Sequence, residues 1–245
     1  MGEERRVTDR VAAAQTRDGA GATVRRAIGS SRVPYLDPFL LLDEFSIAPP
    51  AGFPDHPHRG FELLTYVLDG ELHHADSTGN REVLGRGALQ KIRVGRGLVH
   101  SELPGPGGAH GLQLWVNLPA ARKKAEPEYL TLPTTPEVSD PPAKLRLVAG
   151  ERTLVNFDRP LLYWDVTLSP GVLLRPVPAD WTLFTYGLEG TARYGPERLA
   201  VPAGELLIWS AGDTLRVEAT HQSRFVVVAA PPIGEPVHRW GPFVD

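Results

Sequence analysis

The sequence predicts an all-β protein. Glycine and proline number 25 and 24 among the 245 residues, and they separate short stretches rich in valine, leucine, tyrosine and tryptophan. This distribution is typical of many short strands joined by tight turns. In residues 111–119, GLQLWVNLP, aliphatic side chains alternate with other residue types, as expected for a strand with one face toward a core.

Five further segments have the composition of strands: RLVAG, LLYWDVTL, ELLIWSAG, TLRVEA and RFVVVAA, at residues 146–150, 161–168, 205–212, 214–219 and 224–230. The best helix candidate is residues 119–130, PAARKKAEPEYL. It is short, and Pro127 would interrupt the hydrogen bonds of a helix. We therefore expect no helical layer.

Composition excludes several classes of function. The net charge of -3 and the pI of about 6.2 argue against direct nucleic-acid binding and against binding to a membrane surface, which both favour basic patches. The chain has no cysteine, so disulfides, thiolate-bound zinc and iron–sulfur clusters are excluded.

The polar first 30 residues lack the apolar core of a signal peptide, and no apolar run approaches the ~18 residues of a membrane span. These features predict a soluble, cytoplasmic protein.

A proline-rich segment, residues 132–145, is the expected linker between two domains, 1–135 and 136–245. An internal repeat across it supports this division. Leu63–Gly70, LLTYVLDG, matches Leu183–Gly190, LFTYGLEG, at an offset of 120 residues. A duplicated β-domain explains such a match.

Two glycines extend the repeat. Gly87 and Gly95 match Gly204 and Gly212 at an offset of 117. Because these matches occur in the same order and at equal spacing, chance similarity is a poor explanation, and we expect two similar β-domains in one chain.

Two short motifs suggest a metal site. His56 and His58 are two residues apart, and so are His100 and Glu102; in a strand, residues at this spacing point the same way. Pro57 places the first pair at a strand start or a sheet edge. Three imidazoles suit iron, copper, nickel or zinc, and the carboxylate favours harder ions such as Fe(II) or Mn(II). Four protein ligands on an octahedral ion leave two positions for water, O₂ or substrate. The alternative is a hydrogen-bonded polar cluster.

The repeat provides an internal control for this hypothesis. At the same offsets, the second domain has none of the four proposed ligands, and their places are taken by Pro176, Pro178, Val217 and Ala219. The histidines are therefore not needed for the fold, which favours a function in the first domain.

Other polar residues near the motifs have two interpretations each. Glu62 is either a salt-bridge partner or a catalytic base. His73 and His74 are adjacent, so only one can face inward, and we expect exposure to solvent. Gln113 and Trp115 either line the metal side of the strand or pack in the core.

The motifs resemble those of a known family. HPHRGFE and GRGLVHSE resemble the two cupin motifs, and their order with DPFLLLDEF, HGLQLWVNLP, EPEY and GPFV resembles the pirin family over residues 24–244. This resemblance implies two cupin barrels, the first holding one iron ion, Fe(II) or Fe(III), on His56, His58, His100 and Glu102. It also implies a metal-free second barrel. Family members continue past GPFV into a helical tail, and the present sequence stops at Asp245.

The resemblance implies two functions. The first is a quercetin 2,3-dioxygenase that opens flavonols with O₂, with Glu62 or Glu102 as the proton acceptor. Manganese, nickel, copper or zinc would be alternative metals. The second is an iron-dependent or redox-dependent regulator that binds a transcription factor or a metabolic enzyme. The acidic pI makes a protein the expected partner in that case.

Overall fold

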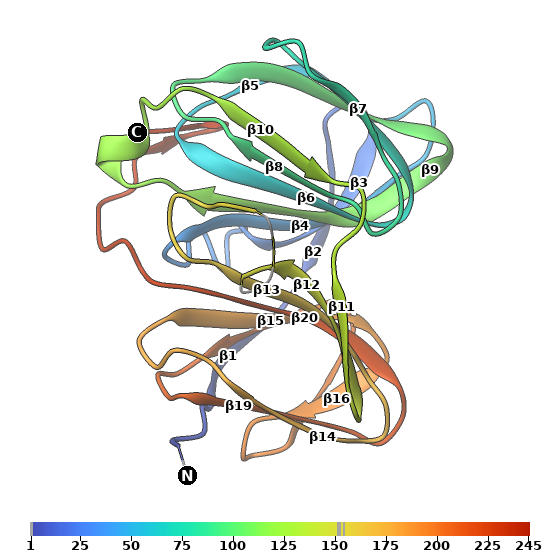
Figure 1. Ribbon diagram of the computed structural model, residues 1–245, viewed down its shortest axis with the longest axis vertical. Coiled ribbons are helices and arrows are strands. Elements are labelled where there is room, and N and C mark those ends of the chain that lie inside the picture. Colours follow the sequence, from blue (N-terminus) through green and yellow to red (C-terminus); the bar gives the residue numbers. More distant parts are fainter. Residues whose placement is uncertain (1, 151–152, 154) are drawn as a thin grey trace. The chain divides into compact units, whose positions relative to one another are not determined.

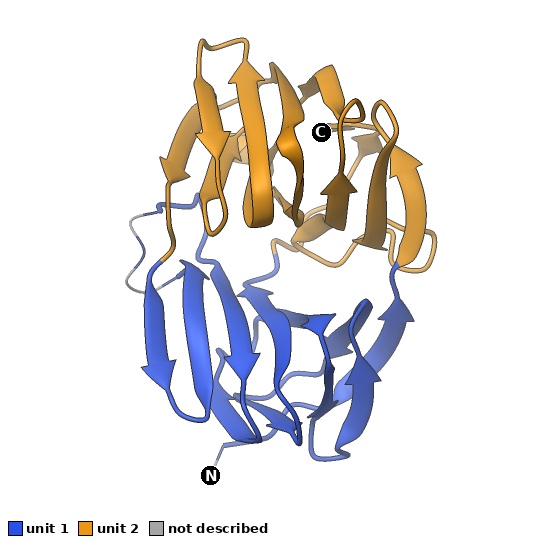
Figure 2. Cartoon of the chain, turned by 90° about the vertical axis from the view of Figure 1, so that its right-hand side faces the viewer, with its two compact units in different colours: residues 1–13, 136–232 blue, residues 14–135, 233–245 orange. Residues whose placement is uncertain are grey.

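A computed structural model describes residues 2–150, 153 and 155–245 of the chain. Strands dominate it, and the one short helix among the described residues is the 3₁₀ turn η1 (Ala120–Arg122) (Figure 1). The chain separates into two compact units, residues 14–135 with 233–245, and residues 1–13 with 136–232 (Figure 2). We call them the N-terminal barrel and the C-terminal barrel. The all-β, two-barrel prediction is confirmed.

The N-terminal barrel is built on one sheet with the order β10-β8-β6-β9-β4-β3-β2; β5 pairs with β9 and β7 with β6. A separate hairpin, β21–β22, comes from the end of the chain. The strands are β2 (Ala14–Asp18), β3 (Ala22–Ile28), β4 (Phe39–Ile47), β5 (Phe53–His58), β6 (Phe61–Asp76), β7 (Arg81–Leu84), β8 (Leu89–Arg93), β9 (Leu98–Asn117), β10 (Glu128–Leu132), β21 (Arg239–Trp240) and β22 (Phe243–Val244).

The C-terminal barrel has two sheets, with the orders β1-β18-β15-β20-β13-β12-β11 and β14-β19-β16-β17. The strands are β1 (Val7–Ala12), β11 (Glu137–Asp140), β12 (Ala143–Ala149), β13 (Leu162–Leu168), β14 (Gly171–Pro176), β15 (Thr182–Glu189), β16 (Thr191–Tyr194), β17 (Leu199–Pro202), β18 (Glu205–Trp209), β19 (Thr214–Ala219) and β20 (Ser223–Ala230).

Alternation along β6 and β9 builds the interior of the N-terminal barrel. Phe61 and Leu63 of β6 lie in one buried cluster with Ile92 of β8 and Trp115 of β9. The residues next to them on β6, Glu62 and Leu64, are buried as well, so both faces of this strand are covered here. The same face of β9 carries the polar residues of the candidate site.

The two barrels repeat one arrangement of strands, but the register of the repeat differs from the one expected. In the N-terminal barrel, His58 lies opposite Leu98. In the C-terminal barrel, Arg175 lies opposite Leu215, which is 117 residues after Leu98. Arg175 is therefore the counterpart of His58, in place of the expected Pro178.

The same pairing relates the other histidines to apolar residues. His56 lies opposite His100, and Leu173 lies opposite Val217, so Leu173 and not Pro176 is the counterpart of His56. The offset changes because five residues separate β14 from β15, whereas two separate β5 from β6. The C-terminal barrel still has no histidine at these places.

The chain ends depart from the expected domain boundaries of 1–135 and 136–245. Residues 1–13 belong to the C-terminal barrel, where β1 pairs with β18. Arg5 is fully buried there, and its guanidinium donates hydrogen bonds to the carbonyls of Pro178, Ala179, Trp181 and Ser210. These four bonds attach the N-terminal segment to the barrel.

Residues 233–245 belong to the N-terminal barrel. Val244 is buried, and its amide donates to the Arg59 carbonyl at 2.9 Å. The Arg59 side chain forms a two-contact ion pair with Asp245. The end of the chain is thus anchored beside β5.

The proline-rich segment changes one expectation, and the helix candidate confirms the expectation of no helical layer. The expected linker, residues 132–145, contains strand β11 and the start of β12. The helix candidate, residues 119–130, forms only η1 and the start of β10. No helix in the described residues has the length and apolar character needed to cross a membrane.

Candidate metal centre

The candidate site lies where β5 pairs with β9. His56 is directly opposite His100, and their ring centroids are 4.4 Å apart. The His58 ring lies 4.6 Å from that of His56 and 5.0 Å from that of His100. One nitrogen from each ring falls within 4.8 Å of the others. Three imidazoles that are this close can share one metal ion.

Local features of the backbone orient these three rings toward one another. A register shift between Phe53 and His56 bulges β5, and bulges commonly redirect side chains next to functional sites. Pro57 between the histidines is exposed, so both neighbours point inward. Before β9, Gly95 and Gly97 have φ angles of 52° and 129°, a region that favours glycine.

Each of the three histidines has a ring nitrogen that is available to a metal ion. Both ring nitrogens of His58 and both of His100 are buried without a hydrogen-bond partner among the described residues. Each such atom costs roughly 1–3 kcal/mol unless something satisfies it. In contrast, His56 Nδ1 donates to the Pro54 carbonyl at 2.8 Å, which leaves the Nε2 lone pair available. The residues therefore fit a metal ion.

Burial also keeps the rings of His58 and His100 neutral, as metal ligation requires. Burial, followed by the neighbouring His56, lowers the pKa of His58 to about 3. Burial, followed by the other histidines, lowers the pKa of His100 well below its usual value. Neutral imidazoles at pH 7 present free lone pairs without competition from protons.

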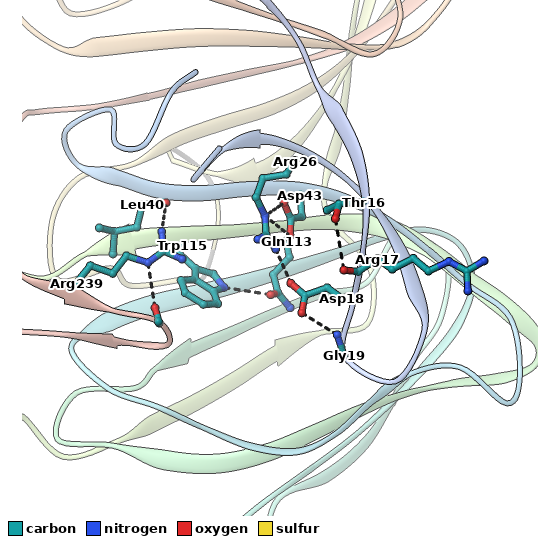
Figure 3. Close-up of polar contacts among 11 residues, drawn as sticks. Thr16, Arg17, Asp18, Gly19, Arg26, Leu40, Asp43, Gln113, Trp115 and Arg239 are labelled. Carbon is teal, nitrogen blue, oxygen red and sulfur yellow. Dashed lines mark hydrogen bonds and ion pairs between the residues drawn. The ribbon is translucent and has the colours of Figure 1, made fainter. Parts of the chain in front are cut away.

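Glu102 lies on the same face of β9 as His100 and, together with His56 and His58, lines a cavity. Its carboxylate accepts a hydrogen bond from Thr65 Oγ1 at 2.9 Å and another from Gln113 Nε2 at 2.7 Å. Trp115 Nε1 donates to Gln113 Oε1 at 3.1 Å, which orients the amide (Figure 3). Glu102 is outside the group of three residues with mutually close ligand atoms, and its role as a fourth ligand stays a prediction.

Glu62 lies elsewhere. It is an odd number of residues from Thr65 on β6, so its side chain leaves from the opposite face of the strand. There it forms a buried ion pair with Lys91 at 3.0 Å. It is not among the residues that line the cavity. The structure thus brings the three histidines and Glu102 together and leaves Glu62 out.

A cavity of about 410 Å³ opens beside His56 and His58. One wall is charged: the Arg26 guanidinium donates to Asp43 at 2.9 and 2.7 Å and to Asp18 at 2.6 Å (Figure 3). The apolar part of the wall comes from Val24, Leu41, Phe45 and Phe53.

Residues from the end of the chain complete the wall. The Arg239 guanidinium lies 5.1 Å from the Trp115 ring centroid and donates to the carbonyls of Leu40 and Gly241 (Figure 3). Sequence reasoning did not find Arg239, because nothing in the local pattern connects it with residues 120 or more positions earlier.

The burial of His74 also differs from the expectation. His74 was expected to be exposed, and it is buried. Its ring stacks on Tyr129 at 5.0 Å and lies 5.5 Å from His100. Its Nε2 donates to Asp76 at 3.2 Å. Although burial alone raises the pKa of Asp76, hydrogen bonds from Asn80, Thr78 and His74 lower it to about 2.

Comparison with known proteins identifies the family. A sequence profile of pirin matches residues 21–116, and one of the pirin C-terminal cupin domain matches residues 163–245. Human pirin is 39% identical over all of this chain and 89% of its own length. A pirin-like protein from Solanum lycopersicum is 42% identical over 98% of this chain and 86% of its own.

Solved structures agree. A quercetin 2,3-dioxygenase from Acinetobacter baumannii is 28% identical, with a TM-score of 0.88 over 98% of this chain and 91% of that one. The bacterial pirin YhhW from Escherichia coli, in complex with nickel(II), has a TM-score of 0.76 at 19% identity over 95% of this chain and 100% of that one. On these matches, the chain belongs to the pirin family.

Proposed function

We propose that the protein is a metal-dependent dioxygenase that opens the ring of flavonols or related enolizable aromatic compounds. The observation that carries this proposal is the convergence of His56, His58 and His100 beside a cavity, with buried nitrogens that lack partners. Iron is the proposed metal, with Glu102 as its fourth ligand. The nickel in the related bacterial structure supports keeping nickel and other divalent ions as alternatives.

The cavity suits a flat aromatic substrate. Its volume of about 410 Å³ lies within the usual range for small-molecule sites, which is roughly 300–1,000 Å³. Phe53 and Trp115 provide aromatic wall area beside the histidines. Such walls favour planar rings and exclude water from the reacting atoms. The similarity to a quercetin 2,3-dioxygenase at 28% identity points to the same substrate class.

Glu102 is the residue that would accept the substrate hydroxyl proton. A bound metal ion would supply Lewis acidity toward the substrate oxygen and a redox path for O₂. Each Glu102 oxygen already accepts one hydrogen bond, from Thr65 or Gln113, and each retains a further acceptor position. We assign no proton transfer to Glu62, since Lys91 holds it on the other face of β6.

Oxygen uptake tests this function. Protein loaded with Fe(II) under anaerobic conditions should consume O₂ when quercetin or kaempferol is added, with loss of the flavonol absorbance. The variant His56→Ala should show neither metal retention nor uptake, whereas His221→Ala, at an exposed position, should match the wild type. A loaded protein that consumes no O₂ with any flavonol would rule out this substrate class.

A regulatory role is the second candidate, and one surface favours it. On β9, Val99 and Leu103 alternate with the site residues and are 40% and 45% exposed. Exposed Val83 on β7 lies in register with Leu103, since both lie opposite His73 of β6, which separates them. A protein that docked on these apolar side chains would contact the strand that carries His100. Pull-downs with iron-loaded and iron-free protein would test it: equal capture in both states argues against metal-dependent regulation.

A further inference from the structure

The C-terminal barrel contains a cavity that the proposed reaction does not use. Its volume is about 860 Å³, roughly twice that of the cavity beside the histidines. The walls are mainly apolar and include Trp164, Trp181, Phe157 and Leu147. A cavity of this size with aromatic walls is suited to an organic ligand.

An arginine occupies the place of a proposed metal ligand in this barrel. The strand pairing makes Arg175 of β14 the counterpart of His58. Leu173 and Arg175 face the barrel interior, because the residues between and beside them, Val172 and Leu174, are exposed. Where the N-terminal barrel would hold a metal cation, the C-terminal barrel thus carries a permanent guanidinium charge.

A second guanidinium lines the same cavity. Arg159 Nη2 donates to the Pro232 carbonyl at 3.1 Å, and its Nε is buried without an acceptor among the described residues. A buried donor of this kind is costly until an acceptor reaches it. The cavity lining also includes Asp158, and Asp140 holds one edge of Arg175 in an ion pair.

These charges favour a ligand with a single carboxylate. Arg175 still has donors besides the Nη2 that contacts Asp140, and guanidinium groups bind carboxylates through paired hydrogen bonds. The aromatic side chains would contact the flat, apolar remainder of such a ligand. A divalent cation is unsuited to a cavity that contains two guanidinium groups.

We propose that the C-terminal barrel is a second binding site, which takes a flat aromatic carboxylate on Arg175 and Arg159 with its rings against Trp164 and Trp181. The site is independent of the metal centre, since none of its described lining residues belongs to the N-terminal barrel. Loss of metal-dependent activity therefore does not count against this second site. Failure of the second site to bind its ligand likewise does not count against the metal centre.

Calorimetric titration with 1-naphthoate tests the proposal, and 1-naphthalenemethanol serves as the neutral probe of similar shape. Wild-type protein should bind the carboxylate at least about tenfold more tightly than the alcohol. Arg175→Met should lose that preference while it still binds the alcohol, which also shows that the cavity remains folded. Arg193→Met is the matched control: Arg193 lies in the same barrel on β16, is 45% exposed and does not line the cavity.

The His56→Ala variant should bind 1-naphthoate as the wild type does. The proposal is overturned if wild-type protein does not bind 1-naphthoate at millimolar concentration, if Arg175→Met binds it unchanged, or if His56→Ala abolishes the binding. If Arg175→Met binds neither probe, the variant Arg159→Met is measured in its place. A weaker affinity of Arg159→Met for 1-naphthoate, with unchanged affinity for the alcohol, supports the site. An unchanged affinity for 1-naphthoate refutes it.

Discussion

His56 and His100 are direct partners across β5 and β9, with their ring centroids 4.4 Å apart. The corresponding pair in the C-terminal barrel is Leu173 and Val217. The same strand pairing therefore builds a polar site in one barrel and part of an apolar core in the other. What distinguishes the barrels is the identity of a few inward-facing side chains.

The two buried glutamates should respond differently to amide substitution. Glu102→Gln replaces one carboxylate oxygen by an amide group that meets a donor from Thr65 or Gln113. We expect metal affinity to fall by at least about tenfold. Glu62→Gln should retain metal but lower the free energy of unfolding by about 2 kcal/mol or more, because it leaves the Lys91 charge buried. Glu128, 3.7 Å from Lys91, offsets part of that cost.

Metal titration and chemical denaturation of the same two variants check this prediction. If Glu62→Gln lost metal while Glu102→Gln kept it, the assignment of the two glutamates would have to be exchanged.

Lys123 should make stability depend on pH in the alkaline range. Its ammonium donates to the Gly60 carbonyl at 3.0 Å and to Asn117 at 2.7 Å, and burial lowers its pKa to about 8. In the unfolded chain the value is about 10.4, so between these values the unfolded state binds more protons. Raising the pH from 8 to 10 should therefore stabilise the wild type relative to Lys123→Met.

Denaturation curves at pH 8 and pH 10 measure this difference. Lys124 is the adjacent, exposed lysine, and Lys124→Met should follow the wild type at both values. A pH response in Lys123→Met equal to that of the wild type would show that Lys123 is not the cause.

Gly60 should be needed for the attachment of the chain end beside the site. Its φ is 93°, and a Cβ at this position would lie 1.7 Å from the Val244 carbonyl oxygen. Gly60→Ala should therefore displace Val244 and disturb His58, two residues away. Gly79 has a φ of 98° and open space around the Cβ position, so Gly79→Ala should show only the backbone strain of about 1–2 kcal/mol.

Thermal unfolding and metal affinity of both variants provide the comparison. Gly60→Ala should lose more stability than Gly79→Ala and should also lose metal affinity. Equal effects of the two substitutions would mean that the contact with Val244 is unimportant.

Much of the site follows from local sequence. The spacing of His56 and His58, and of His100 and Glu102, predicts their common direction because side chains alternate along a strand. The resemblance to the pirin family, which the comparisons confirm, then predicts that the two segments lie together in one barrel. The sequence did not show on which face of its strand Glu62 lies. Glu62 is three positions before Thr65, so the two side chains leave from opposite faces of β6.

Other features depend on long-range pairing and on loop length, which local patterns do not specify. Nothing near Arg5 or Arg239 indicates which barrel each terminal segment joins. His74 is buried because Tyr129, from a strand more than 50 positions later, covers it. The repeat register shifted because a loop in the second half has three more residues, and this places Arg175 where the sequence alone suggested a proline.

The amount of metal bound per chain shows whether His56, His58 and His100 form a metal centre. Wild-type protein and the variants His58→Ala, His100→Ala and His221→Ala should be loaded with Fe(II) under anaerobic conditions, desalted and analysed for iron by mass spectrometry. We expect about one iron per wild-type chain and per His221→Ala chain, and almost none in the other two variants. Equal iron in His100→Ala and the wild type would contradict a metal centre on these histidines.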